Sequence, residues 1–233
     1  MSVSPRETLD RSLKQLLDDV LILGSMVEEA IRSSVAALKA RDFEASRRIY
    51  LDDAKINRLH FDLENRCIIL IATQQPMARD LRLLAAVLEI VTELERIGDY
   101  AKGIARINLL LGEKPLIKPL IDIPRMAEKG IDMLHRSLSA FVDGDVETAR
   151  AIPKEDDEVD NLYNQVYREL LTYMISDPTT IDRANYLLWA AHNLERMADR
   201  VTNICERTVY MVTGEMRELD RTDDELNALE RTY

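Results

Sequence analysis

The sequence is poor in the residues that favour β-sheets and tight turns. Aromatic residues account for 5% of its 233 residues, and it contains only seven glycines and seven prolines. Sheets are enriched in aromatic and β-branched residues, while glycine and proline interrupt helices. Hydrophobic residues reach 46% and charged residues 31%. This composition predicts a soluble, mainly helical protein that buries a sizeable core.

Positive charge and long apolar runs are also scarce. The 31 lysines and arginines are outnumbered by 42 acidic residues, which gives a formal net charge of −11. Binding to nucleic acid or to an anionic membrane surface requires a basic surface, so neither is expected. The chain has no stretch of about 18 apolar residues that would span a membrane. Its first residues, MSVSPRE, lack the apolar centre of a signal peptide. We therefore expect a cytoplasmic protein with no direct membrane insertion.

The sequence also lacks the common signatures of catalytic and zinc sites. Its two cysteines, Cys67 and Cys205, lie in separate helical segments without metal-type spacing. Buried free thiols in a reducing compartment are the expected state. No glycine-rich phosphate loop, Ser/His/Asp set or Cys/His pair is present. We predict that the protein is not an enzyme.

What the sequence does contain is an apolar period of 3.6 residues that restarts after each turn signal. This period predicts an all-α fold of six long helices. The fifth helix is expected to follow the Asp-Gly-Asp turn at 143–145 and to kink near Pro153. The expected ranges are about 7–39, 43–74, 77–111, 125–142, a fifth helix that ends near 176, and 180–212.

The chain consists of two similar halves. The only proline-rich stretch, 112–124, lies between them, and Pro76 and Pro178 mark the same helix–helix turn in each half. We predict two tandem, pseudo-symmetric three-helix bundles over residues 1–114 and 115–214. Each half is long enough to bury its own core. Residues 215–233 form a charged tail that is expected to fray or to make a short last helix.

A short acidic motif occurs twice, one hundred residues apart, as LERIGD at 94–99 and LERMAD at 194–199. A helix turns about 100° per residue, so a Glu and an Asp four positions apart share one face. In both copies that face continues an apolar side of the helix. Burying unpaired carboxylates is costly, so these side chains require a cation, a metal ion or water.

The preceding helix of each half adds two more oxygen-bearing side chains. Asp53 lies 23 residues before Pro76 and Asp99 lies 23 residues after it, so both reach the same level of an antiparallel pair. The same count applies approximately to Asp156 and Asp199. Oxygen donors from two helices suit a hard cation. The predicted ligands are Asp53, Asn57, Glu95 and Asp99 in the first half, and Asp156, Asp160, Glu195 and Asp199 in the second.

Other interpretations remain open at this stage. Acidic residues four apart are common on solvated helix surfaces, and Glu93 is assigned to such a surface. The three histidines, His60, His135 and His192, do not cluster and are interpreted as surface or packed residues. A di-iron carboxylate enzyme would need Glu-x-x-His motifs, and no histidine here has a glutamate three positions before it. A spectrin-like structural spacer would explain the bundles but not the duplicated acids.

The sequence resembles the PhoU family of phosphate-uptake and phosphate-signalling regulators over about residues 10–212. The resemblance is strongest in QQPMARDLR at 74–82 and LERIGDY at 94–100, and again in LERMADRVTNI at 194–204. It implies two three-helix bundles related by pseudo-twofold symmetry. It also implies metal bound at the two acidic motifs, with iron, nickel, zinc or magnesium-like ions as candidates, while the oxygen donors themselves suit magnesium, manganese, calcium or iron.

The same resemblance implies a regulatory role. PhoU proteins restrain phosphate uptake by the high-affinity phosphate ABC transporter and help to keep the phosphate-sensing histidine kinase inactive. The expected partners are therefore the transporter ATPase subunit, the histidine kinase and a second copy of the chain in a homodimer. The chain departs from the family motif at Gly103, Ala198 and Arg200, and Asn57 lowers the charge of the first site. The second half, with four carboxylates against three, is expected to bind metal more strongly.

Overall fold

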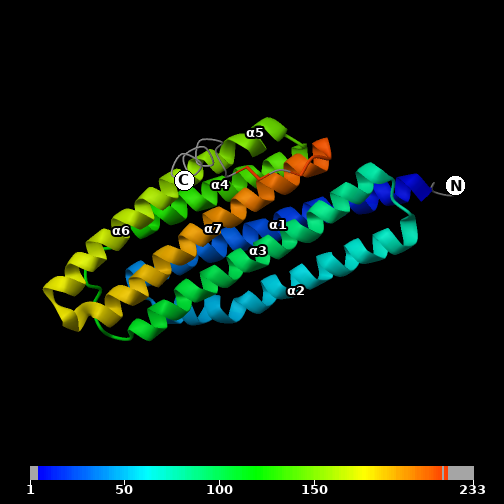
Figure 1. Cartoon of the computed structure of the whole chain (residues 1–233). Coiled ribbons are helices and arrows are strands. Elements are labelled where there is room, and N and C mark those ends of the chain that lie inside the picture. The colour runs from blue at the N-terminus through cyan, green and yellow to red at the C-terminus, as the bar shows by residue number, and fades with distance from the viewer. Residues whose placement is uncertain (1–4, 217, 220–233) are drawn as a thin grey trace, which may run out of the picture.

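The computed structural model describes residues 5–216 together with 218 and 219 (Figure 1). The described residues contain helices and turns but no strand, which confirms the predicted all-α fold. The helices are α1 (Pro5–Ala40), α2 (Phe43–Gln74), α3 (Ala78–Leu111), α4 (Asp122–Asp143), α5 (Val146–Ala151), α6 (Asp156–Ser176) and α7 (Ile181–Thr213), with 3-10 turns η1 (Ile152–Glu155) and η2 (Pro178–Thr180).

The helices begin and end at the turn residues that stand out in the sequence. Asp42 caps α2 by accepting a hydrogen bond from the backbone N–H of Ala45. Gln75 adopts a left-handed conformation, with φ of 47°, immediately before Pro76, which separates α2 from α3. Gly144 and Gly214 close α4 and α7 in the same left-handed region, which glycine enters without strain.

The predicted fifth helix is divided into two helices, where only a kink was expected. Pro153 lies in η1, and this 3-10 turn separates the six-residue α5 from α6. Proline cannot donate the backbone hydrogen bond that would continue an α-helix through this point. The segment therefore runs as α5, η1 and α6 along one side of the second half. The prediction of six long helices is otherwise confirmed, with α4 beginning three residues earlier than expected.

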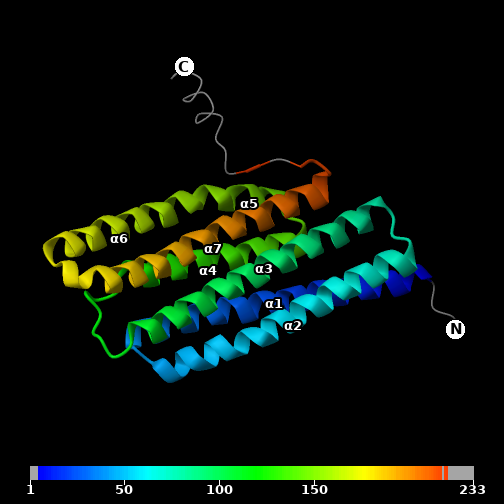
Figure 2. The same cartoon turned by 60° about the horizontal axis from the view of Figure 1, so that its bottom comes forward.

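Two three-helix units lie side by side. α1, α2 and α3 pack on one another, and so do α4, α6 and α7. The most extensive pairing in the molecule joins α3 to α7, and α1 also packs against α4, as Figures 1 and 2 show. α3 and α7, the third helices of the two halves, therefore lie at the centre of the molecule. Each carries one acidic motif, and one side of each faces the other.

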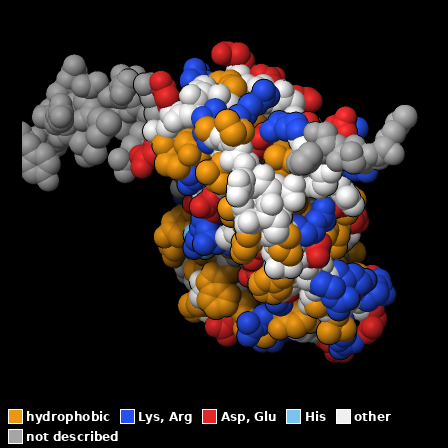
Figure 3. All heavy atoms as spheres, turned by 90° about the vertical axis from the view of Figure 1, so that its right-hand side faces the viewer, with side chains coloured by type: hydrophobic (Ala, Val, Ile, Leu, Met, Phe, Trp, Pro, Cys, Tyr) orange, Lys and Arg blue, Asp and Glu red, His pale blue; other side chains and the backbone are white. Residues whose placement is uncertain are grey.

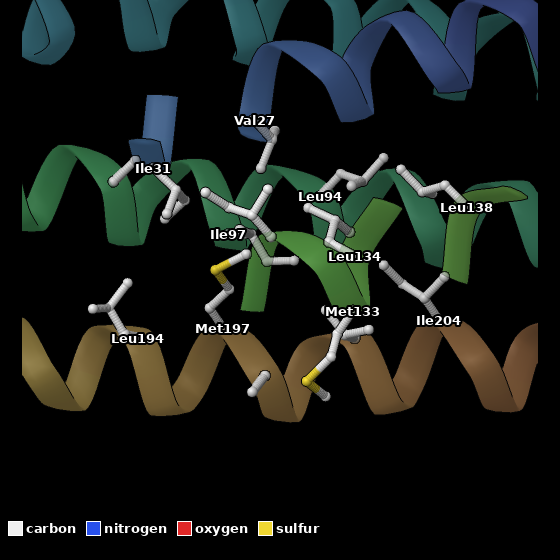
Figure 4. Packing of buried hydrophobic residues seen from close by; sticks show 14 of the residues in the cluster. Val27, Ile31, Leu94, Ile97, Met133, Leu134, Leu138, Leu194, Met197 and Ile204 are labelled. Carbon is white, nitrogen blue, oxygen red and sulfur yellow. The ribbon is translucent and has the colours of Figure 1, made fainter. Parts of the chain in front are cut away.

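A single hydrophobic core spans both halves. Leu94 and Ile97 of α3 lie across from Met197 of α7 and Leu134 of α4, with Val27 of α1 nearby (Figure 4). All five belong to one continuous cluster of buried side chains. The expectation that each half would bury a core of its own is thus replaced by a shared core, because the third helix of each half is apolar on more than one side.

Three further predictions concern the cysteines, membrane-spanning helices and the C-terminal tail. Both cysteines are free and buried, as expected, and burial raises the pKa of each thiol to about 12. No helix in the described ranges is long and apolar enough to cross a membrane. Most of the predicted tail at 215–233 lies outside the described residues.

Candidate metal centres

The four predicted residues of the first half meet between α2 and α3. Asp53 is 5% exposed, and its Oδ2 accepts a hydrogen bond from the Asn57 amide at 3.3 Å. The same oxygen lies 2.7 Å from the ammonium of Lys102 on α3, and that ammonium lies 3.7 Å from Asp99. α2 and α3 therefore bring these residues to one level, as counting from the proline turn predicted.

Glu95 completes this first group. Burial raises the pKa of Glu95, and the negative charges of Asp99 and Asp53 raise it further. Nearby His60 partly offsets that effect. The electrostatic influence of Asp53 and Asp99 on Glu95 shows that the predicted acids of the two helices interact.

Sequence reasoning missed the lysine in this group. Lys102 lies three residues after Asp99, on the same side of α3, and its hydrogen bond to Asp53 raises the pKa of Lys102. An ammonium with a raised pKa stays charged at neutral pH. The signal was present in the sequence, because residues three apart on a helix are neighbours.

The second half gathers four carboxylates between α6 and α7. Burial raises the pKa of Asp156 to about 7, helped by the negative charges of Asp160, Asp199 and Glu195. Burial also raises the pKa of Asp160 and of Glu195, and in both cases the charge of Asp199 adds to the effect. Carboxylates that disfavour one another's ionisation in this way are held close together.

Buried acceptor atoms in both groups are left without a hydrogen bond. Well-packed proteins pair nearly all such atoms, so an exception calls for a ligand, a proton or water. Within the described residues these unpaired atoms are Asp53 Oδ1, Asn57 Oδ1, Asp156 Oδ1 and Glu195 Oε2. Oxygen donors of this kind fit a hard or borderline cation. No three His, Cys, Asp or Glu side chains of the described chain are already arranged around one point, so an ion would have to draw them together.

Two histidines lie beside the acidic groups, although the sequence showed no cluster. His60 of α2 is buried, and neither ring nitrogen has a hydrogen-bond partner, with Nε2 3.4 Å from the Glu64 carboxylate. His192 of α7 places Nδ1 3.2 Å from Glu195 Oε2 without the geometry of a hydrogen bond. His60 follows Asp53 by seven residues and His192 precedes Glu195 by three, spacings that share a helix face.

Glu93 was wrongly assigned to a solvated surface. It is 6% exposed and lies in the contact between α3 and α7, with Arg96 at 2.9 Å and Arg200 of the other half at 3.4 Å. Arg200 also donates a hydrogen bond to the hydroxyl of Tyr100. The side of α3 that carries Glu93 faces α7, and a single-helix pattern contains no information about that neighbour.

The raised pKa of Asp156 predicts a pH-dependent stability of the metal-free protein. Between about pH 4 and 7 the folded protein retains a proton on Asp156 that the unfolded chain has lost, so the free energy of unfolding falls as pH rises. We expect Asp156→Asn to remove this loss and to stabilise the chelator-treated protein at pH 8. The expected gain is about 1–2 kcal/mol, after allowing for partial solvent access.

Urea unfolding midpoints at pH 5 and pH 8, in the presence of chelator, measure this effect. Glu113→Gln, which removes an exposed acid from the connection between the halves, is the matched control. If both variants gained equally at pH 8, or if neither changed the pH dependence, the crowding of carboxylates around Asp156 would not be the cause.

Comparison with known proteins decides the family. The family model of the PhoU domain matches residues 20–107 and again 123–208, so each match covers the three helices of one half. The chain belongs to the PhoU family. The first match ends and the second begins on either side of the connection between α3 and α4, and each contains one copy of the duplicated acidic motif.

Sequence relatives and solved PhoU structures agree with this assignment. A phosphate-specific transport system accessory protein PhoU homolog from Aquifex aeolicus is 38% identical over 208 residues, which cover 89% of this chain and 94% of the relative. PhoU from Escherichia coli is 34% identical over 203 residues, 87% of this chain and 84% of the relative.

Two crystal structures share the fold. PhoU from Pseudomonas aeruginosa has a TM-score of 0.84 and 31% identity, over 88% of this chain and 99% of its own. The phosphate transport system regulatory protein PhoU from Streptococcus pneumoniae has a TM-score of 0.83 and 32% identity, over 90% and 99%. These PhoU relatives are named as accessory or regulatory proteins, which agrees with the prediction that the chain is not an enzyme.

One departure from the usual PhoU motif has a structural reason. The first motif has Gly103 at a position where the family usually has asparagine. A Cβ atom at Gly103 would lie 2.9 Å from the amide nitrogen of Asn193 on α7. The side chain from the neighbouring half thus occupies the space, and glycine permits the close approach of α3 and α7. The first PhoU motif therefore lacks an oxygen donor that the second retains in Asn203.

Proposed function

We propose that this PhoU protein is a cytoplasmic regulator of phosphate homeostasis. In this proposal it restrains phosphate uptake and the phosphate-starvation response by binding the ATPase subunit of a phosphate ABC transporter and the phosphate-sensing histidine kinase. The observation that carries the proposal is the PhoU-domain match over both halves. The names of the relatives, phosphate-specific transport system accessory protein and phosphate transport system regulatory protein, support it.

Surface features are consistent with a protein-binding role. The end of the molecule where α2 turns into α3 displays hydrophobic side chains next to lysine and arginine (Figure 3). Met77 and Leu81 in this region are both exposed. Their neighbour Asp80 is buried and paired with Arg6, and Arg82 donates a hydrogen bond to the carbonyl of Met211. Asp80 and Arg82 thus stabilise the fold through contacts with other helices, while Leu81 remains available to a partner.

Deletion of the gene tests the regulatory proposal. We expect phosphate-starvation genes to be expressed in phosphate-rich medium, because the restraint on the sensor kinase is lost. A pull-down with the intact protein should recover the transporter ATPase or the kinase. Complementation with the wild-type gene is the control. Unchanged expression after deletion, together with recovery of neither partner, would contradict the proposal.

We also propose that the acidic group of the second half binds a divalent or trivalent metal ion. The ligands would be Asp156, Asp160, Glu195 and Asp199. Asp156 Oδ1 and Glu195 Oε2 are buried without a hydrogen bond, and the raised pKa values of Asp156, Asp160 and Glu195 also support the assignment. A bound cation relieves the repulsion among these carboxylates and permits all of them to ionise. All-oxygen donation suits manganese, magnesium, calcium or iron, and an approach by His192 would add a donor that zinc and nickel accept.

Elemental analysis of protein purified without chelator tests the metal proposal. We expect Glu195→Gln to lower the bound metal at least several-fold, because it removes a charged ligand from the group of four carboxylates. Glu95→Gln is the matched change in the other half and should lower the metal content less or not at all. Equal losses in the two variants, or protein that remains metal-free after incubation with each candidate ion, would contradict it.

A further inference from the structure

We propose that the Lys102 ammonium takes the place of a metal ion in the first half, so that the protein binds metal in its second half only. This inference rests on the proposed metal site of the second half. Its basis is the position of the ammonium, 2.7 Å from Asp53 Oδ2 and 3.7 Å from Asp99 Oδ1. A cation supplied by the chain itself thus already joins the acids of α2 and α3.

Lys102 is held in this position by more than one contact. Besides its two carboxylate partners, the ammonium lies 5.5 Å from the centre of the Tyr50 ring, within the range of a cation–π interaction. Asp53, its closest partner, is buried, so this hydrogen-bonded ion pair is poorly screened by water. Removing the ammonium would leave a buried carboxylate without its cation, which is costly.

The corresponding positions of the second half supply no such cation. One hundred residues after Lys102, the chain has Thr202, which is 4% exposed and whose hydroxyl oxygen accepts and donates no hydrogen bond among the described residues. The repeat alignment that pairs Asp53 with Asp156 also replaces Tyr50 by Pro153, so the aromatic ring is missing as well. Each half is therefore built for a different source of positive charge.

The formal charges of the two groups differ in the same direction. Three carboxylates and the Lys102 ammonium give −2 in the first half, whereas four carboxylates give −4 in the second. A divalent ion bound by both Asp53 and Asp99 would have to enter the space next to the Lys102 ammonium, where like charges repel. The ion would have to displace Lys102, and the second half imposes no such cost.

Removal of the lysine should uncover a metal site in the first half. Asp53 Oδ1 and Asn57 Oδ1 are buried and have no hydrogen-bond partner, so they would be available to an ion once the ammonium is gone. We expect Lys102→Thr to bind additional Mn²⁺, and the extra ions to be lost again on adding Glu95→Gln. The reciprocal change, Thr202→Lys, should abolish the Mn²⁺ binding of the second half.

Mn²⁺ titration of the full-length protein, followed by electron paramagnetic resonance and calorimetry, measures the number of ions bound. Lys55→Thr is the matched control, because Lys55 is an exposed lysine on α2 that pairs with Asp52, outside the group. Circular dichroism verifies that each variant is folded. Wild-type and Lys55→Thr proteins should bind the same number of ions, all of them sensitive to Glu195→Gln.

The outcomes separate this inference from the metal proposal on which it rests. If Glu95→Gln removes bound Mn²⁺ from the wild-type protein, or if Lys102→Thr gains no ion while the wild type binds Mn²⁺, the inference is overturned and the second-half site is retained. If neither the wild type nor Lys102→Thr binds Mn²⁺, both proposals fail. Binding by Lys102→Thr alone would uphold the role of the lysine and remove the second-half site.

Discussion

Leu94→Ala is expected to lower the free energy of unfolding by about 2–5 kcal/mol and to destabilise both halves together. Leu94 is completely buried on α3, among side chains from both halves of the molecule (Figure 4). Truncation removes apolar contacts and leaves a cavity that the surrounding helices fill only in part. Because α3 packs on α7 within one continuous core, the loss should not stay within the first half.

The single tryptophan makes this prediction testable half by half. Trp189 lies on α7 in the second half, in edge-on contact with the ring of Tyr186. Its fluorescence reports on the second half, whereas circular dichroism reports on all helices. We expect the two urea transitions of Leu94→Ala to coincide and to shift by the same amount. Leu51→Ala is the control, because Leu51 is 71% exposed and its truncation should have little effect. A Trp189 transition that stayed at the wild-type midpoint would contradict the shared core.

Metal removal is expected to lower the free energy of unfolding by about 2.7 kcal/mol when the comparison sample contains free metal at about a hundred times its dissociation constant. Burial and neighbouring negative charge raise the pKa of Asp156, Asp160 and Glu195, and a bound ion relieves this repulsion only in the folded state. Thermal or urea unfolding with and without chelator measures the change. Glu195→Gln should be nearly insensitive to chelator. If chelator also left the melting temperature of the wild-type protein unchanged, these acids would be interpreted as solvated surface residues and not as metal ligands.

Chelator and pH should act together on the wild-type protein. In the metal-free state, the free energy of unfolding declines between about pH 4 and 7, because folded Asp156 keeps a proton that the unfolded chain loses. Saturating metal should reduce that decline, because the cation favours the ionised form. The same crowding that costs stability in the empty protein thus provides the affinity for the ion.

Much of the fold followed from the sequence because it depends on local physics. A 3.6-residue apolar period and the glycine, proline and aspartate residues at each turn act within a few residues, so helix ranges and their order were predictable. The residue count on each side of Pro76 also placed Asp53 and Asp99 at the same level. Two long helices joined by a tight turn must run antiparallel. In the structure, Lys102 lies between the two carboxylates and pairs with both Asp53 and Asp99.

Only the tertiary structure decided what faces each helix on its remaining sides. The sequence pattern predicted two separate cores, whereas α3 and α7 pack together and merge them into one. Glu93 looked like a solvated residue until its side of α3 was found against Arg200. The same holds for Lys102, whose contact with Asp53 crosses between two helices. The sequence alone determined the helices and the level of the acidic groups, since both follow from local periodicity. The burial of each charge and its counter-charge depends on packing between segments far apart in the chain, and that was decided by the tertiary structure.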